Sequence, residues 1–443
     1  MNTPIVDFVK KYTESEPLRL HMPGHKGVSL LGTERIDLTE IEGAGDLYHA
    51  SGIIRESEIN AGKLFGADTF YSCEGSSLCI RAMLYLTLTY AKSVGKAPIV
   101  AAGRNAHKTF LSGAAMLDID VRWIYPQNAD IYVSCNVTPA ELDAFLKETN
   151  AMAVYLTSPD YLGNVLDIEA LAKVCHAHGA LLLVDNAHGA YLKFLSPSRH
   201  PIDLGADVCC DSAHKTLPAL TGSAYLHISK YAPSIFSENA KKALAFFGST
   251  SPSYLILQSL DLVNRYLSDG YRERLSAFVG ELQARKELLL KHGYSFLGNE
   301  PLKLTLNAKR YGYGGEELAE LLSKENIVCE FSDPDVTVLM LTPEIGVSGL
   351  DRLVKALLSV PKKQEITSRP PRIEKAEKIC SVRQAMLSQS ETVSIENSVE
   401  RVLASATLSC PPAIPIIVGG ERITENALRL FEYYGIDKCE VIK

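Results

Sequence analysis

The sequence predicts an α/β fold with a mostly parallel sheet, and beyond it a smaller α+β domain and a C-terminal extension. The first observation behind this prediction is a set of short apolar runs, at residues 97–101, 153–157, 181–184 and 207–210. Because these runs are continuous rather than alternating, they are typical of parallel strands covered on both faces. The second observation is the amphipathic segment 167–179, which predicts a helix between two of these strands, ended by a glycine. Such strand–helix–strand repetition favours right-handed crossovers.

The third observation is a change of pattern after about residue 260. Residues 281–290 predict a long helix, and residues 302–306 and 336–341 predict isolated strands, a combination typical of an α+β domain. The polar, proline-containing stretch 361–372 predicts a linker. We therefore expect five parts: an N-terminal segment (1–45), a large domain (46–262), a small α+β domain (263–360), the linker (361–372) and a C-terminal domain (373–443).

Composition excludes several classes of protein. The 443 residues carry a net charge of −7 and no basic tract, so nucleic acid is not expected as a partner. No apolar run approaches the ~18 to 20 residues of a membrane helix, and residues 1–7 lack the features of a secretory signal. We expect a cytoplasmic protein. We expect no metal site either, because His176 and His178 lie two apart on a helix and point to different faces.

Small and polar residues open one predicted helix in a way that suits a phosphate. Residues 74–77, Glu-Gly-Ser-Ser, precede an apolar-periodic run. The N–H groups at such a helix start, together with the hydroxyls of Ser76 and Ser77, are suitable phosphate ligands. Taken alone, the segment fits plain N-capping by serine at least as well.

Three further residues follow predicted strands, at the ends where parallel sheets bind ligands. Asp185 emerges from the run 181–184, and a buried carboxylate needs a cation or several donors. A protonated pyridine nitrogen would be such a cation, although Asp185 could equally cap the next helix. Lys215 comes 30 residues later, about one strand–helix–strand unit. His107 follows another strand, where it could lie flat on an aromatic ring or serve as a hydrogen-bonded loop histidine.

Three His-Lys pairs occur, at residues 25–26, 107–108 and 214–215. Only Lys215 follows a strand at the right interval after Asp185. Lysine amines form Schiff bases with aldehydes, and the aldehyde cofactor that carries both a pyridine nitrogen and a phosphate is pyridoxal phosphate. The order phosphate turn, stacking histidine, pyridine carboxylate and lysine therefore predicts a pyridoxal-phosphate enzyme.

These residues and their surroundings resemble the bacterial ornithine/lysine/arginine decarboxylases. The likeness extends over almost the whole chain and is carried by residues 20–27, 46–52, 105–109, 185–190, 212–221, 250–254 and 410–415. It is strongest to the short arginine/lysine decarboxylase-like members, which lack the N-terminal wing domain of the large inducible enzymes. The resemblance implies an aspartate-aminotransferase-like fold, pyridoxal-phosphate fold type I, in which the large domain 46–262 binds the cofactor.

The resemblance also implies a role for each candidate residue. Lys215 would form the Schiff base, Asp185 would pair with the pyridinium nitrogen, and His107 would stack on the ring. His188 would lie beside the phenolic oxygen of the ring, and His214 or Lys215 would return a proton to the product. The implied phosphate ligands are Ser76, Ser77, Ser212 and His214, with Thr250 reaching the phosphate of the neighbouring subunit. A homodimer with composite active sites is therefore implied.

The implied activity is decarboxylation of arginine, lysine or ornithine to CO₂ and an amine of the kind used in polyamine biosynthesis. Two alternatives stay open: another fold-type I reaction, by an aminotransferase or lyase, and a catalytically silent homologue that binds the cofactor. Three departures from the family pattern matter. Asn186 stands where a glutamate is common, Gly222 follows Thr221 where other members carry larger residues, and Ser405 stands where we expect a glutamate that could bind a cationic side chain. The substrate amino acid therefore stays open.

Overall fold

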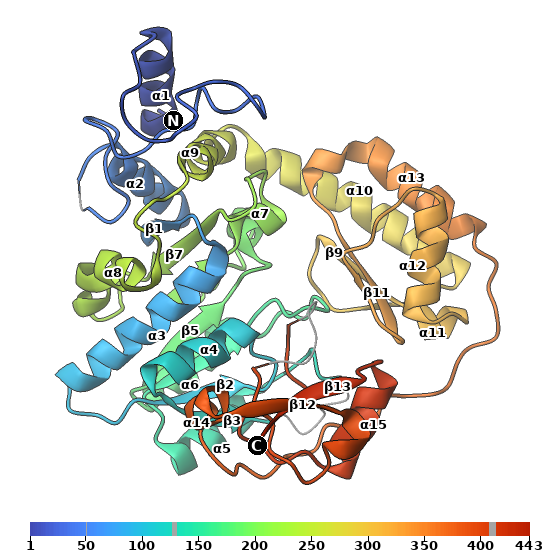
Figure 1. Ribbon diagram of the computed structural model, residues 1–443. Helices are drawn as coiled ribbons and strands as arrows, with labels where there is room; N and C mark the ends of the chain where they lie inside the picture. Colours follow the sequence, from blue (N-terminus) through green and yellow to red (C-terminus); the bar gives the residue numbers. More distant parts are fainter. Residues whose placement is uncertain (50, 126–130, 407–412) are drawn as a thin grey trace. The chain divides into compact units, whose positions relative to one another are not determined.

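The computed structural model describes residues 1–49, 51–125, 131–406 and 413–443. These residues separate into two compact units: unit 1 comprises residues 1–97 and 179–274, and unit 2 comprises residues 98–178 and 275–443. Among the described residues, seven mostly parallel strands make the principal sheet, four of them in unit 1 and three in unit 2 (Figure 1). The predicted α/β class is therefore confirmed.

Unit 1 supplies strands in the hydrogen-bonded order β1-β7-β6-β5. β5 and β6 are parallel, with Asp185 opposite Cys210, whereas β7 is antiparallel to both β6 and β1. The exits of β5 and β6 therefore lie at one edge of the sheet. The elements of unit 1 are α1 (Pro4–Glu14), α2 (Ile53–Phe65), β1 (Asp68–Ser72), α3 (Gly75–Ser93), β5 (Leu181–Asp185), η1 (Ala190–Phe194), β6 (Val208–Asp211), α7 (Ala213–Thr216), β7 (Ala224–Ile228), α8 (Ser234–Phe247) and α9 (Tyr254–Ser268).

Unit 2 begins with three parallel strands in the order β4-β2-β3 and the helices that connect them. These elements are β2 (Ile99–Gly103), α4 (Lys108–Leu117), β3 (Asp120–Ile124), α5 (Pro139–Thr149), β4 (Ala153–Thr157) and α6 (Ile168–Ala177). Helix α6 and strand β4 match the predicted helix 167–179 and strand 153–157 closely.

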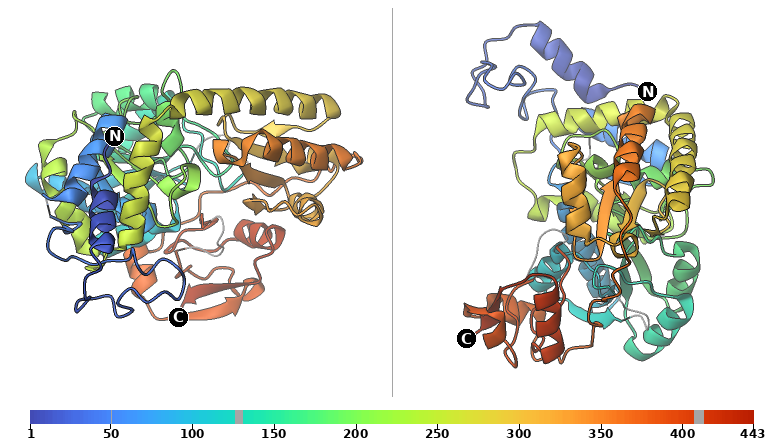
Figure 2. Two further views of the ribbon diagram at one scale, coloured as in Figure 1. Left: turned by 90° about the horizontal axis from the view of Figure 1, so that it is seen from above. Right: turned by 90° about the vertical axis from the view of Figure 1, so that its right-hand side faces the viewer.

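The rest of unit 2 is a mixture of helices and antiparallel strands. A four-stranded sheet has the order β10-β11-β9-β8, and β12 pairs with β13. Helices α10, α12 and α13 lie beside the four-stranded sheet (Figure 2). The elements are α10 (Tyr271–His292), whose residues 271–274 belong to unit 1, β8 (Phe296–Leu297), β9 (Lys303–Asn307), α11 (Ala308–Tyr311), α12 (Gly315–Lys324), β10 (Phe331–Ser332), β11 (Val336–Met340), η2 (Pro343–Ile345), α13 (Gly346–Ser359), α14 (Val382–Leu387), β12 (Ser390–Ser394), η3 (Ile395–Asn397), α15 (Glu425–Tyr433) and β13 (Lys438–Ile442).

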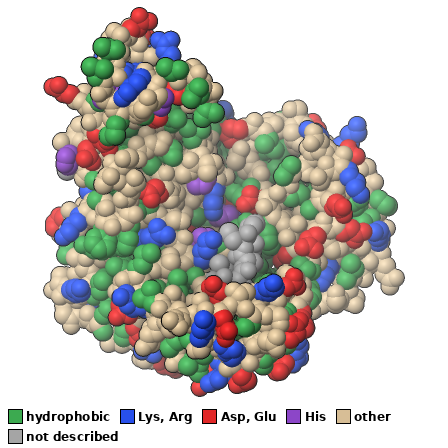
Figure 3. Space-filling view, viewed as in Figure 1, with side chains coloured by type: hydrophobic (Ala, Val, Ile, Leu, Met, Phe, Trp, Pro, Cys, Tyr) green, Lys and Arg blue, Asp and Glu red, His purple; other side chains and the backbone are tan. Residues whose placement is uncertain are grey.

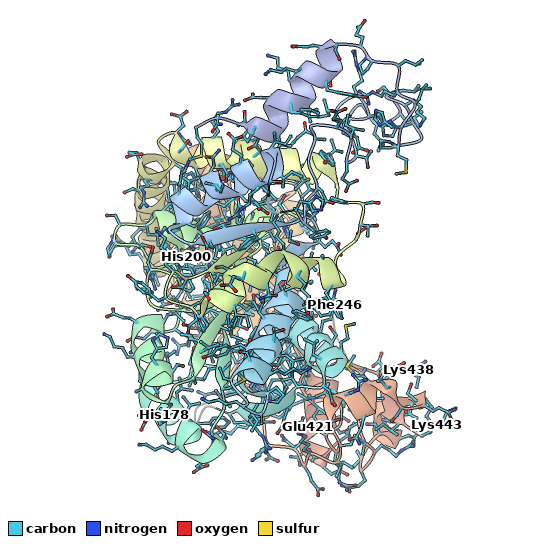
Figure 4. All side chains as sticks on the ribbon, turned by 90° about the vertical axis from the view of Figure 1, so that its left-hand side faces the viewer. His178, His200, Phe246, Glu421, Lys438 and Lys443 are labelled. Carbon is cyan, nitrogen blue, oxygen red and sulfur yellow. The ribbon has the colours of Figure 1, made fainter. Side chains whose placement is uncertain are left out.

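The C-terminal part of unit 2 is attached through a buried ion pair. Arg104, just after β2, lies 3.3 Å from Glu421 and donates to the carbonyls of Pro415 and Ile416 at 3.0 and 2.9 Å. Both charged side chains are buried, and Glu421 is labelled in Figure 4. Since a buried charge is costly unless it is paired and hydrogen-bonded, this contact fixes the segment after residue 412 against the exit of β2. The backbone N–H of Lys108 also donates to the carbonyl of Ala413 at 2.9 Å.

Three strands of the principal sheet were not predicted from the sequence: β1, β3 and β7. In β3 the exposed Arg122 interrupts the apolar pattern. In β7 every residue is buried, yet the strand contains His227, which we would not expect in a buried run. The ring is tolerated because Nδ1 lies 2.9 Å from the hydroxyl of Thr69 and Nε2 lies 3.2 Å from a carboxylate oxygen of Asp211.

None of the described helices has both the length and the apolar character to cross a bilayer.

Candidate functional site

Two neighbouring parallel strands of unit 1 carry the predicted lysine and carboxylate. β5 ends at Asp185, and β6 ends at Asp211, after which Ser212 leads into the short helix α7 with His214 and Lys215. All residues of both strands are buried. The change from apolar to polar side chains therefore coincides with the strand ends, where parallel sheets bind ligands.

Lys215 lies against His188, which belongs to the loop after β5. The distance from Lys215 Nζ to His188 Nε2 is 3.0 Å, and the His188 ring is buried. An amine and an imidazole at hydrogen-bond distance can exchange a proton. The structure therefore brings together two residues that lie 27 positions apart in the chain, both of them predicted site residues.

Asp185 is a buried carboxylate, with 3% of its surface exposed. Its Oδ1 accepts from the N–H of Ala187 at 3.2 Å and from the thiol of Cys210 at 3.7 Å. Burial raises the pKa of Cys210, and the charge of Asp185 raises it further, so Cys210 stays a thiol and donates. The next helix, η1, begins at Ala190 with Gly189 as its N-cap residue. Asp185 does not cap that helix, so the capping alternative is wrong.

The predicted phosphate turn lies at the start of the 19-residue helix α3. Glu74 is the N-cap residue and makes no side-chain cap bond, while Ser76 and Ser77 lie inside the first turn. The serine N-capping alternative is therefore also wrong. Ser212 Oγ donates to Ser76 Oγ at 2.9 Å, which joins the exit of β6 to the start of α3. Two hydroxyls at the positive end of a long helix form a setting that favours an anion.

His214 lies at the same helix end. Its Nδ1 donates to the carbonyl of Ser223 at 2.9 Å, and a Cβ on Gly75 would lie 4.0 Å from its Cε1. Burial lowers the pKa of His214, an effect that the bond to Ser223 opposes and the charge of Lys215 reinforces. The ring is therefore neutral near pH 7 with Nε2 unprotonated, and a nearby dianion would favour its protonation.

Two further predicted site residues, His107 and Thr250, belong to other segments of the chain. His107 belongs to unit 2, where it is the N-cap residue of α4 and accepts from the N–H of Thr109 at 3.2 Å. Thr250 is exposed between α8 and α9. Its neighbour Ser249 donates through its backbone N–H to Glu74 at 2.6 Å, so the Thr250 segment borders the start of α3.

A buried polar network surrounds Asp211 that was not predicted from the sequence. Oδ1 of Asp211 accepts from Asn186 Nδ2 at 2.6 Å, and Oδ2 lies 3.0 Å from His200 Nε2 and 3.2 Å from His227 Nε2. His200 is labelled in Figure 4. Burial alone would raise the pKa of Asp211, but the two histidines outweigh it and lower the pKa well below its usual range. The Asp211 carboxylate is therefore ionised. The one signal for this network in the sequence was a charged residue, Asp211, at the end of an apolar strand.

Three residues of this network and its surroundings, His200, Cys209 and Asp211, place potential metal-ligand atoms within 4.8 Å of one another. Burial raises the pKa of the Cys209 thiol well above its usual value, which disfavours the thiolate that a metal requires. The Nε2 atoms of His200 and His227 instead lie at hydrogen-bond distance from the same carboxylate oxygen, Oδ2 of Asp211. The geometry is that of a hydrogen-bonded charge network.

The side chains gathered in unit 1 fit pyridoxal phosphate. The donor set contains an amine (Lys215), a buried carboxylate one strand away (Asp185), and two hydroxyls with an imidazole at a helix start. These groups are chemically matched to an aldehyde, a pyridine nitrogen and a phosphate, respectively. All of these residues belong to unit 1.

Two family models match this chain. Residues 3–298 match the family model described as "Orn/Lys/Arg decarboxylase, major domain", and residues 364–438 match "Orn/Lys/Arg decarboxylase, C-terminal domain". The chain is 28% identical to the "Arginine decarboxylase" of Bacillus subtilis, over 96% of this chain and 92% of that protein. It is 27% identical to the "Uncharacterized protein YaaO" of the same organism, over 97% and 93% of the two chains.

Solved structures give the same fold. The lysine decarboxylase LdcF of Francisella novicida superimposes with a TM-score of 0.81 at 17% identity, covering 100% of this chain and 81% of that one. An alanine–glyoxylate aminotransferase from Nostoc superimposes with a TM-score of 0.55 at 16% identity, covering 71% and 88%. The predicted aminotransferase-like fold is therefore confirmed.

Proposed function

The chain belongs to the Orn/Lys/Arg decarboxylase family, and from this premise we propose that it is a pyridoxal-phosphate-dependent decarboxylase of a basic amino acid. The observation that carries the proposal is the placement of Lys215 and Asp185 on neighbouring strand exits, with His188 at 3.0 Å from the lysine amine. The products would be CO₂ and a polyamine-type amine.

When bound, the cofactor supplies a protonated ring that accepts the electron pair released as CO₂ leaves. The side chains of unit 1 provide the rest. Lys215 holds the cofactor covalently, and the buried carboxylate of Asp185 keeps a proton on the ring nitrogen. Ser76, Ser77, Ser212 and His214 hold the phosphate. The Lys215–His188 contact supplies a path for the proton that replaces the carboxylate.

A panel of amino acids tests the proposed reaction. We expect CO₂ release from one or more of arginine, lysine and ornithine, with arginine assayed first because four relatives carry the name arginine decarboxylase. Keto-acid formation is measured in parallel. Keto acid without CO₂ would identify an aminotransferase. Bound cofactor with neither product from a wide panel would identify a silent homologue. Either result contradicts the proposal.

We also propose a homodimer with composite active sites. Six apolar side chains of the N-terminal segment are between 65% and 89% exposed: Leu18, Leu20, Met22, Val28, Leu30 and Leu31. Apolar side chains are visible on the surface of this part of the molecule in Figure 3. Because these exposed side chains are concentrated within residues 18–31, they support an interaction surface on this segment. A second copy of the chain is the proposed partner, and Thr250 is the residue proposed to reach the phosphate of the other subunit.

Mixing two inactive variants tests the composite site. Lys215→Ala removes the amine, and Thr250→Asp places a carboxylate next to the phosphate. A heterodimer of the two contains one site with both native residues if Thr250 acts across the interface, so mixing by unfolding and refolding should restore activity. If Thr250 acts within its own subunit, each heterodimer site carries one substitution and no activity returns. That result, or a monomeric mass by light scattering, contradicts the composite site.

A further inference from the structure

One side-chain bond links the two strand exits that carry the site. Asn186 directly follows Asp185, and Asp211 directly precedes Ser212 and lies four positions before Lys215. Asn186 Nδ2 donates to Asp211 Oδ1 at 2.6 Å, and both residues are fully buried. The backbone N–H of Asn186 also donates to the carbonyl of Cys210 at 3.0 Å. The Asn186–Asp211 bond therefore extends the β5–β6 pairing by one residue pair beyond Asp185 and Cys210, towards the ligand edge.

The contact with Asp211 fixes the orientation of the Asn186 amide. Because Asp211 can only accept, the NH₂ group of Asn186 must face it. The Asn186 oxygen then points the other way, where it finds no hydrogen-bond partner among the described residues. A Cβ on Gly189 would lie 2.0 Å from that oxygen, so glycine at 189 gives the amide its room.

The other Asp211 oxygen is fixed as well. It accepts from Nε2 of both His200 and His227, whose rings are completely buried. His200 Nδ1 accepts from the N–H of Ile202 at 3.4 Å, and His227 Nδ1 lies 2.9 Å from the hydroxyl of Thr69. Asp211 thus has one oxygen for Asn186 and one for the histidines, and it cannot move without breaking both sets of bonds.

We propose that Asn186 and Asp211 are matched positioning residues, an amide–carboxylate pair that sets the spacing between Asp185 and Lys215. The role rests on the proposed cofactor chemistry of those two residues. It also accounts for the departure at position 186. A glutamate there would set a second carboxylate against Asp211 in a buried site, where two like charges repel strongly.

The geometry predicts that the two groups can be exchanged. In a chain with Asn186→Asp and Asp211→Asn, the new amide oxygen at 211 can accept from both histidines and its NH₂ can donate to the new carboxylate at 186. Asn186→Asp alone leaves two carboxylates at hydrogen-bond distance. Asp211→Asn alone is milder, because rotation of the Asn186 amide by 180° restores a neutral hydrogen bond.

Four proteins test the proposal: wild type, the two single variants and the double variant. The readouts are the thermal midpoint of each cofactor-free protein and the dissociation constant of the cofactor, followed by the pH profile of the visible absorption band of the loaded protein. We expect Asn186→Asp to weaken cofactor binding by about 100-fold or more and Asp211→Asn to weaken it by less than about tenfold. The double variant should bind as tightly as Asp211→Asn, so the second substitution rescues the first.

Asn264→Asp is the matched control. Asn264 is also fully buried in unit 1, but its amide donates to the hydroxyl of Tyr71 at 2.6 Å and to the carbonyl of Ser57 at 3.0 Å. Adding Asp211→Asn should leave the defect of Asn264→Asp unimproved. A double variant no better than Asn186→Asp overturns the pair, and equal rescue of Asn264→Asp shows a general charge effect instead. Failure of wild type itself to bind pyridoxal phosphate would contradict the proposed function and is read separately from the rescue.

Discussion

Lys215→Ala is expected to remove the visible absorption band of the cofactor-loaded protein and to lower kcat/KM by about three orders of magnitude or more. The amine of Lys215 is the proposed covalent attachment point and half of the Lys215–His188 contact, so its removal eliminates both attachment and proton transfer. Other residues of the site would still bind the phosphate, so free cofactor should associate weakly. Spectral titration with pyridoxal phosphate and steady-state kinetics measure the two effects.

Lys230→Ala is the control for this variant. Lys230 is an exposed lysine of the same unit, between β7 and α8, and its substitution should change neither the spectrum nor the rate. A Lys215→Ala protein that keeps a wild-type absorption band would show that another lysine carries the cofactor. The assignment of the whole site would then be wrong.

Asp185→Asn is expected to lower kcat/KM by about 1000-fold while the cofactor stays covalently attached. The substitution preserves shape and the contact with Ala187 but removes the charge. A neutral amide cannot hold a proton on the ring nitrogen, and without that proton the ring accepts electrons poorly. Retained absorption together with lost turnover therefore distinguishes this variant from Lys215→Ala.

The matched control is Asp269→Asn, which neutralises an exposed carboxylate of the same unit. It should leave kcat/KM within about twofold of wild type, as surface substitutions away from a site usually do. Turnover of Asp185→Asn within tenfold of wild type would contradict the proposed role of Asp185.

The sequence identified the parts of this molecule that repeat a simple physical pattern. Strands β4 and β5 are continuous apolar runs, and their ends were found within one residue because the chain changes there from buried to polar. The same rule led to Asp185 and Lys215, since the carboxyl ends of parallel strands meet at one edge. The structure confirms that these two exits are neighbours.

Features that depend on contacts distant in sequence were not predictable. The partners of Asp211 come from β7, from the loop before β6 and from the exit of β5, and no spacing in the chain announces them. His227 in β7 was unexpected for the same reason, because the free-energy cost of burying its ring is offset by the distant residues Thr69 and Asp211.

Three expectations stay predictions: the five-part division of the chain, the stacking role of His107 and the partner of Thr250. The motif 410–415 lies partly outside the described residues.

The most direct test of the central claim is the identity of the residue that carries the cofactor. Wild-type protein is loaded with pyridoxal phosphate, reduced with borohydride, digested, and its peptides are weighed by mass spectrometry. The account predicts a single modified peptide, with the cofactor mass on Lys215. Modification of a different lysine, or no stable adduct at full cofactor occupancy, would contradict it.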